Sequence, residues 1–142
     1  MAGNITLTII KPGAFQKGYT GPILNMINQA GFKIIAMKLI KLSIRQAETF
    51  YAIHRSKPFY ESLVEFMSSG PIIAAVLQKE NAVAEYRRLI GATNPENAEE
   101  GTIRKKYAES VEMNAVHGSD SDANAIVEAD FFFARSERTD CM

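Results

Sequence analysis

Ile72-Ile73-Ala74-Ala75-Val76-Leu77 is the stretch of sequence that decides the fold. A short continuous apolar run that follows turn residues, here Ser69-Gly70-Pro71, is typical of a buried strand. We therefore expect this run to be the central strand of a sheet. The rest of the chain must supply the neighbouring strands and the helices that cover them.

Three other segments have the pattern of strands. Residues 5–9 alternate apolar and polar side chains, which is the period of a strand with one buried face. Residues 32–42 are rich in isoleucine and predict a long second strand, and residues 111–117 predict a brief one before the last helix. Together with the central run, these segments predict a four-stranded sheet.

Helices are predicted where apolar side chains recur at helical spacing or where a capping residue precedes them. Ser43 and Gln46 fit a capping box, and Gly31 can end a helix in a left-handed conformation. The predicted helices cover residues 19–30, 43–54, 58–68, 80–90, 102–107 and 121–132. The polar connection over residues 91–101 is long for a compact domain, and such loops are often functional.

The order of these elements predicts the fold class. Two βαβ-type halves in a chain of 142 residues favour an α+β fold with the ferredoxin-like split βαβ arrangement. We expect a four-stranded antiparallel sheet with helices on one face, plus an extra C-terminal helix. A doubly wound parallel sheet would need more strands and shorter connections.

The composition is that of one globular domain, which we expect to span residues 1–142. Hydrophobic residues make up 46% and charged residues 23%, and 16 Lys and Arg balance 16 Asp and Glu. This balance predicts no nucleic-acid partner and no membrane surface as partner. Cys141 is the one cysteine, which predicts an exposed thiol in the tail without a disulfide framework or zinc spacing. With no signal peptide or apolar span, we expect a cytoplasmic protein.

Asn114-Ala115-Val116-His117-Gly118-Ser119-Asp120-Ser121 is the segment most suited to chemistry. His117 ends an apolar run, and a glycine, hydroxyls and a carboxylate follow it. A neutral imidazole is a nucleophile at ordinary pH, and small polar neighbours can fix its tautomer and leave it room to react. A histidine at a strand end can also be only hydrogen-bonded or exposed, so the octet alone leaves both interpretations open.

Candidate phosphate ligands lie elsewhere in the chain. Gly13 to Thr20 nearly spells a Walker A loop, but Tyr19 stands where that loop needs a lysine, so the match fails. Lys11 ends the first strand at Pro12 and is held at the sheet edge. Arg87, Thr93 and Arg104 flank the long connection. Two arginines, a lysine and a hydroxyl suit a triphosphate, although each alone could be a surface residue.

Five ordered blocks carry a resemblance to a known family. They are Ile10-Lys11-Pro12, Pro58-Phe59 with Met67-Ser68-Ser69-Gly70-Pro71, Gly91-Ala92-Thr93-Asn94-Pro95, Gly101-Thr102-Ile103-Arg104, and Asn114 to Ser121. Over almost its whole length the sequence resembles the nucleoside diphosphate kinases. The order and spacing of the blocks make the resemblance specific.

The resemblance implies an activity and a nucleophile. The protein would transfer the γ-phosphate of a nucleoside triphosphate, mainly ATP, to a nucleoside diphosphate in ping-pong fashion, through a phosphohistidine on His117. Glu128 would hold the other imidazole nitrogen, directly or with Ser119. Tyr51 would lie near the reacting phosphate, unless it serves only to pack the core.

The resemblance also implies the nucleotide site. The phosphates and sugar hydroxyls would be bound by Lys11, Arg87, Thr93, Arg104 and Asn114. Phe59 and Val111 would sandwich the base, and an apolar sandwich reads no base edge, which suits broad base and sugar tolerance. Mg²⁺ would arrive with the nucleotide, with Asp120 holding it through water.

Other expectations concern alternatives, assembly and departures from the family pattern. A non-catalytic nucleotide-binding regulatory module is the alternative function. The family forms tetramers or hexamers built from dimers, so we expect a homo-oligomer and leave the two sizes open. Gly13 replaces an aspartate that commonly follows Lys-Pro, which could loosen the turn behind Lys11. Lys105-Lys106 replaces Gly-Asp and adds positive charge near the phosphate site. We interpret His54 as structural.

Overall fold

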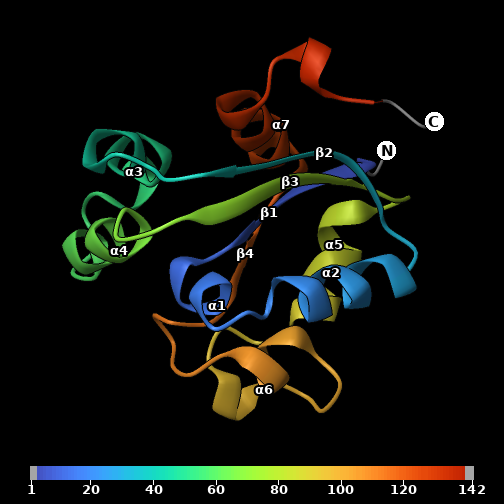
Figure 1. Cartoon of the computed structure of the whole chain (residues 1–142), viewed down its shortest axis with the longest axis horizontal. Coiled ribbons are helices and arrows are strands. Elements are labelled where there is room, and N and C mark those ends of the chain that lie inside the picture. Colours follow the sequence, from blue (N-terminus) through green and yellow to red (C-terminus); the bar gives the residue numbers. More distant parts are fainter. Residues whose placement is uncertain (1–2, 140–142) are drawn as a thin grey trace.

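Four strands form one antiparallel sheet in the computed structural model, which describes residues 3–139 (Figure 1). The strands are β1 (Ile5–Ile10), β2 (Lys33–Ile40), β3 (Ile72–Gln78) and β4 (Val116–Gly118), and the sheet has the order β2-β3-β1-β4. Seven α-helices are described: α1 (Pro12–Gln16), α2 (Thr20–Gln29), α3 (Ile44–Phe50), α4 (Tyr60–Met67), α5 (Ala82–Ile90), α6 (Ile103–Tyr107) and α7 (Asp122–Phe132). Three 3₁₀ turns, Ala52–His54, Pro95–Asn97 and Arg135–Glu137, complete this part of the chain.

The apolar run that opened the sequence analysis is the central part of the sheet, as predicted. Every residue of β3 is buried, and the strand pairs antiparallel with β1 on one side and β2 on the other. β1 in turn pairs with β4, where Ile9 lies opposite His117. The order of the strands and their antiparallel pairing confirm the predicted α+β, ferredoxin-like fold.

Helices cover both faces of the sheet, so the expectation of helices on one face is wrong, although the four-stranded antiparallel sheet is as predicted. One apolar cluster joins β1 and β3 to α1, α2, α5 and α6, through residues such as Ile23, Ile27 and Ile90. The other joins the same strands to α3, α4 and the C-terminal α7, through residues such as Met67 and Phe132. Figure 1 shows α7 on one side of the strands and α2, α5 and α6 on the other, with α3 and α4 beyond the strand ends. The extra C-terminal helix is therefore accompanied by α3 and α4 on the second face.

The expectation of one buried face for the first strand is wrong. Thr6 and Thr8 are as fully buried as the apolar residues between them, at 0% exposure. Thr8 Oγ1 shares a hydrogen bond of 2.5 Å with the hydroxyl of Tyr86 in α5. The buried hydroxyl of Thr8 is tolerated because it is hydrogen-bonded, whereas the Thr6 hydroxyl is buried with no partner among the described residues.

Local capping signals set the helix ends as predicted. The Ser43 side chain accepts a hydrogen bond from the Gln46 N–H, and the Gln46 side chain accepts one from the Ser43 N–H. Thr102 and Ser121 cap α6 and α7 with one hydrogen bond each, which their side chains accept from the N–H groups of Lys105 and Asn124. Gly31 has a φ of +95°, the left-handed conformation expected after α2.

Three segments differ from their predictions. The helix predicted over residues 43–54 ends at Phe50, and a 3₁₀ turn follows over Ala52–His54. α1 was not predicted: Pro12 occupies its first turn, where the missing N–H costs no hydrogen bond. The last strand is shorter than residues 111–117, because residues 109–113 close a loop in which Glu109 N–H donates to the Met113 carbonyl at 2.9 Å. Cys141, predicted to be an exposed thiol, lies outside the described residues. Within residues 3–139, no helix has the length and apolar character needed to cross a membrane.

β4 lies directly against α5 because residue 118 is glycine. A Cβ atom at Gly118 would come within 3.1 Å of both Ile90 and Tyr86 side chains. Such a contact is tighter than ordinary packing, so a larger residue would push β4 away from the helix. This close approach fixes the strand that carries His117.

Candidate active site

A pocket of about 390 Å³ opens beside the end of β1 and the loop before β4. Seven of the residues predicted for the site line it. Lys11, Tyr51, Asn114 and His117 contribute polar groups, and Phe59, Thr93 and Val111 are the others. The volume is within the usual range for small-molecule sites, and the lining combines apolar walls with a few polar groups.

His117 is held by a carboxylate from another element. Its Nε2 lies 2.9 Å from Glu128 Oε1 on α7, and the two side chains are 18% and 13% exposed. Ser119 Oγ donates to the same Glu128 oxygen at 2.7 Å and accepts a hydrogen bond of 3.1 Å from the Leu7 N–H of β1. Glu128 thus occupies one imidazole nitrogen, and Nδ1 is the nitrogen that it does not engage. The carboxylate engages the ring directly, and Ser119 braces that carboxylate.

Lys11 is buried at the junction of β1 and α1. Its Nζ donates to Asn114 Oδ1 at 2.7 Å, and its side chain is among the lining of the pocket. Burial first, and then the nearby Arg104, lower the pKa of Lys11 to about 7, and Glu112 opposes both effects. With this pKa, a negatively charged ligand in the pocket would favour the protonated, charged form of Lys11 near neutral pH.

Arg104 and Arg87 do not line this pocket; Arg87 lines a separate hollow with Gly91 and Thr102. Arg104 is 6% exposed, and its guanidinium donates to the carbonyls of Asn114, Gly91 and Val116 at 3.4, 3.1 and 2.9 Å. Burial first, and then Arg87, lower its pKa to about 10. The exposed Arg87 donates weakly to the Gly118 carbonyl at 3.4 Å. Both cations thus contact the backbone around β4.

The aromatic residues of the pocket have different environments. Tyr51 is 5% exposed, its hydroxyl has no partner among the described residues, and burial and then Glu128 raise its pKa well above the ordinary value. Its ring meets the His117 ring edge-on at 6.3 Å. Phe59 and Val111 are 46% and 52% exposed, unusual values for apolar side chains of this size. Their exposed side chains form apolar walls of the pocket that are in contact with solvent.

Asp120 is the predicted metal-related residue, and it does not line the pocket. It is exposed, and its Oδ1 accepts a hydrogen bond of 2.7 Å from Asn124. Over residues 3–139, no group of three His, Cys, Asp or Glu side chains could form a metal cage. This arrangement fits a metal that a ligand carries in, with at most a carboxylate nearby.

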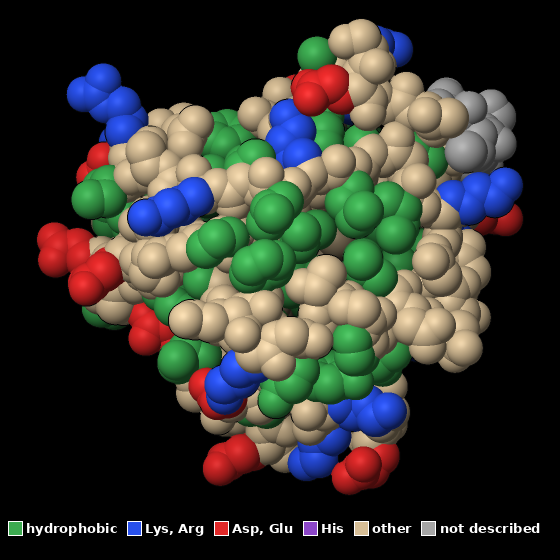
Figure 2. All heavy atoms as spheres, viewed as in Figure 1, with side chains coloured by type: hydrophobic (Ala, Val, Ile, Leu, Met, Phe, Trp, Pro, Cys, Tyr) green, Lys and Arg blue, Asp and Glu red, His purple; other side chains and the backbone are tan. Residues whose placement is uncertain are grey.

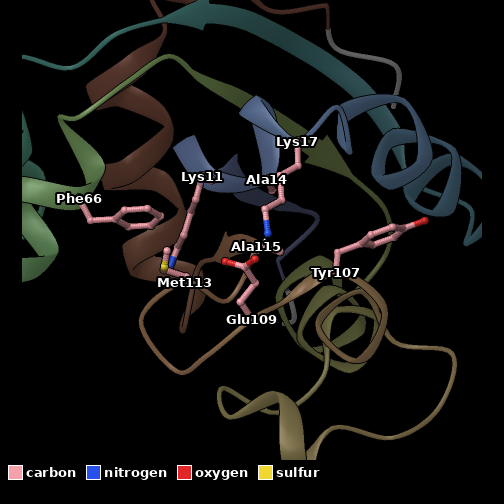
Figure 3. A pocket seen from close by; sticks show the side chains of 9 residues that line it. Lys11, Ala14, Lys17, Phe66, Tyr107, Glu109, Met113 and Ala115 are labelled. Atoms are coloured by element: carbon pink, nitrogen blue, oxygen red, sulfur yellow. Dashed lines mark ion pairs between the residues drawn. The ribbon is translucent and has the colours of Figure 1, made fainter.

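A second hollow next to Lys11 is too small to be a ligand site (Figure 3). Its volume is about 10 Å³, enough for one water molecule at most. Figure 3 shows Lys11 reaching toward Met113 beside the Phe66 ring, and Lys17 paired with Glu109. This ion pair connects the end of α1 to the loop after α6, and both side chains are nearly half exposed.

Four pocket residues were not predicted for the site. They are His54, Ser62, Leu63 and Glu112. His54 was interpreted as structural, yet its ring lies 5.6 Å from the ring of Phe59 and 6.4 Å from that of Tyr51. The signal for His54 was its position between two predicted site residues. Glu112 directly follows Val111, and that adjacency was its one signal in the sequence.

Comparisons with known proteins identify relatives of this chain. The family model described as nucleoside diphosphate kinase matches residues 4–138. A nucleoside diphosphate kinase of Flavobacterium psychrophilum is 59% identical over 138 residues, which cover 97% of this chain and 99% of that protein. One from Chlorobaculum tepidum is 56% identical over 132 residues, covering 93% of this chain and 94% of its own.

Solved structures show the same likeness. The Aquifex aeolicus nucleoside diphosphate kinase superposes with a TM-score of 0.94 at 42% identity, covering 96% of this chain and 99% of that one. A halophilic nucleoside diphosphate kinase from Halobacterium salinarum, solved in complex with CDP, gives 0.93 at 33% identity, with 99% and 94% covered. From the family match and these relatives, the chain belongs to the nucleoside diphosphate kinase family.

Proposed function

We propose that this protein transfers the γ-phosphate of a nucleoside triphosphate, mainly ATP, to a nucleoside diphosphate through a phosphohistidine on His117. Its family and relatives support this kinase activity. The observation that carries the assignment of the nucleophile is the contact of 2.9 Å between His117 Nε2 and Glu128. It leaves Nδ1 unengaged in a pocket that also holds Lys11.

The chemistry follows from that tautomer. With Nε2 protonated and donating to Glu128, Nδ1 carries the lone pair. Nδ1 attacks the γ-phosphorus, the bond from that phosphorus to the β,γ-bridging oxygen breaks, and the nucleoside diphosphate leaves with that oxygen. A terminal oxygen of a second diphosphate then attacks the phosphorus and the N–P bond breaks. Two half-reactions at one site give ping-pong kinetics.

Positive charge and hydrogen-bond donors around the phosphates supply most of the catalysis in phosphoryl transfer. Lys11, Arg87 and Arg104 would bind the phosphates, and Asn114 and Thr93 would bind phosphate or sugar oxygens. Asn114 already accepts from Lys11 and donates to the Thr93 carbonyl at 3.3 Å, so these groups are oriented together. The unpartnered Tyr51 hydroxyl would donate to the transferring phosphoryl group.

The base would lie between Phe59 and Val111. Both are exposed at the pocket and offer apolar surface to the faces of a planar ring. Stacking of this kind tolerates every base, because each base has a π-face. Broad base and sugar tolerance is therefore part of the proposal.

Mg²⁺ would bind with the nucleotide, held mainly by the phosphates. When bound it neutralises part of the phosphate charge. Asp120 would hold it through water, since its carboxylate is exposed and only one of its oxygens has a partner among the described residues. A carboxylate and water suit this ion, which keeps much of its hydration shell.

Two assays test the proposed function. Incubation with γ-labelled ATP should yield a protein-bound phosphate that is labile in acid and stable in base, and His117→Asn should abolish it. A coupled assay should detect GTP formed from GDP and ATP. If the protein binds nucleotides without forming GTP, it is the non-catalytic regulatory module instead. If His117→Asn still exchanges phosphate, the nucleophile is another residue.

We also propose a homo-oligomer built from dimers, either a tetramer or a hexamer, from one domain spanning residues 1–142. β2 is an edge strand, and its Met37 and Leu39 are 51% and 58% exposed. Figure 2 shows hydrophobic side chains gathered across the middle of the face on which Figure 1 places β2 and β3. Edges and apolar faces of this kind are usually covered. Light scattering should give the oligomer mass, and a monomer at micromolar concentration would contradict the proposal.

The predicted cytoplasmic location is likewise a proposal. The sequence has a single cysteine and so no disulfide framework, which is typical of proteins in a reducing compartment. Fractionation of the native host would test it.

A further inference from the structure

Glu112 is a carboxylate that lines the nucleotide pocket and takes no part in the proposed phosphate transfer. Among the residues that line the pocket, it is the single acidic side chain. It is exposed and directly follows Val111, one wall of the proposed base slot. Within residues 3–139, the Glu112 carboxylate has no hydrogen bond or ion pair of its own. Its oxygens are therefore open to a ligand.

The position of Glu112 matches the edge of a bound base better than its faces. Phe59 and Val111 would contact the two faces of the ring, and Glu112 lines the same pocket as both. A carboxylate is an acceptor only, so it can pair with an N–H donor and is repelled by a carbonyl oxygen. Cytosine presents an amino group at the position where uracil presents a carbonyl oxygen.

We propose that Glu112 accepts a hydrogen bond from the exocyclic amino group of the base and so favours cytosine and adenine nucleotides over uracil nucleotides. The inference rests on the proposed function, because it assumes that the base lies between Phe59 and Val111. In this proposal Glu112 determines a preference among bases, while the slot between Phe59 and Val111 itself accepts every base. The effect is a bias between substrates, since the carboxylate is in contact with solvent.

Glu112 could instead act only on the phosphate end of the pocket. Its charge opposes the effects of burial and Arg104 on Lys11. That influence concerns a phosphate ligand and is the same for every base. A comparison between two nucleotides that differ only in the base edge therefore separates the two roles.

The experiment compares CDP and UDP as acceptors with ATP as donor. The native protein should show kcat/KM for CDP roughly three- to tenfold above that for UDP, the size expected for one charge-assisted hydrogen bond weakened by solvent. Glu112→Gln should bring the ratio to within about twofold, because an amide can both donate and accept. The matched control is Glu65→Gln, which removes the same charge beside a neighbouring hollow that Glu112 also lines, outside the nucleotide pocket. It should keep the native ratio.

Two outcomes would overturn the inference. One is a native ratio near one. The other is a change in both kcat/KM values by the same factor in Glu112→Gln, which would mean that the carboxylate acts on Lys11 alone. If the native protein transfers no phosphate, the proposed function fails, and equilibrium binding of CDP and UDP to the native protein and to Glu112→Gln then decides the inference by the same ratios. Thermal melting of each variant confirms that it is folded.

Discussion

Lys11 should take up a proton when a nucleotide binds. Burial and Arg104 lower its pKa to about 7, so at pH 8 only about one molecule in ten carries the ammonium charge in the empty pocket. A polyphosphate beside Lys11 favours the charged form and should return its pKa well above 8. Binding of ADP at pH 8 should therefore take up about 0.9 proton, and at pH 7 about half a proton.

The same shift has a consequence for folding. The difference between 10.5 and about 7, at about 1.4 kcal/mol for each pKa unit, means that protonating Lys11 costs roughly 5 kcal/mol more in the folded protein than in the unfolded chain. Between pH 7 and 10.5 the unfolded state holds the proton and the folded state does not, so this group raises stability with pH across that window. Below pH 7 both states are charged, so the destabilisation by Lys11 is at its full size and no longer changes with pH; above pH 10.5 both states are neutral and it is absent.

Calorimetry measures the proton uptake directly. ADP with Mg²⁺ is titrated into the protein at pH 8 in Tris and in HEPES, and the difference in observed heat divided by the difference in ionisation heat gives the protons bound. Lys11→Met should remove the uptake along with part of the affinity. His117→Asn should keep it, which excludes the imidazole as the source. An uptake near zero in the native protein, or an unchanged uptake in Lys11→Met, would refute the reasoning.

Three further substitutions test the packing and the site. Gly118→Ala should lower the free energy of unfolding in urea by about 1–3 kcal/mol, because its Cβ would come within 3.1 Å of α5 side chains. Gly21→Ala, with nothing within 4 Å, should raise it by up to about 1 kcal/mol, and equal effects would contradict the tight contact. Glu128→Gln should lower kcat about 10- to 100-fold in steady-state assays with little change in KM, since it weakens the hold on His117; a change in KM alone would argue against that role. Phe59→Ala should raise the KM for diphosphates about tenfold while leaving the thermal midpoint nearly unchanged, because the ring is 46% exposed; a large drop in the midpoint would make it a core residue.

The fold was predictable where neighbouring residues set the structure. The apolar run of β3, the capping box at Ser43 and the caps at Thr102 and Ser121 all depend on residues a few positions apart. The prediction for β1 was wrong because the polar side chain of Thr8 meets Tyr86, which is 78 residues away. A polar residue in an alternating pattern is exposed only if no distant partner covers it. The pattern contains no information on that partner.

The site was predictable through the resemblance and less so from the residues alone. Glu128 lies 11 positions after His117 on another element, and no local rule brings its carboxylate to the ring. Arg104 looked like a free phosphate ligand, whereas the structure gives its guanidinium three backbone carbonyls. His54 and Glu112 became visible only when the chain enclosed a pocket. Residue types that can carry out chemistry can be found in a sequence, but the residues that contact them can be identified only from the folded structure.

The departures from the family pattern fall where local structure can accommodate them. The turn after Lys11 stays closed despite Gly13. α1 begins there at Pro12, and the Lys11 N–H donates to the Ala115 carbonyl at 2.9 Å. Lys105 and Lys106 are exposed in the last turn of α6, where positive charge favours the negative end of the helix dipole. α6 has only five residues, so its stability depends on such contributions at both ends. The two lysines therefore stabilise the short helix that positions Arg104, and their charge need not reach a phosphate to serve the site.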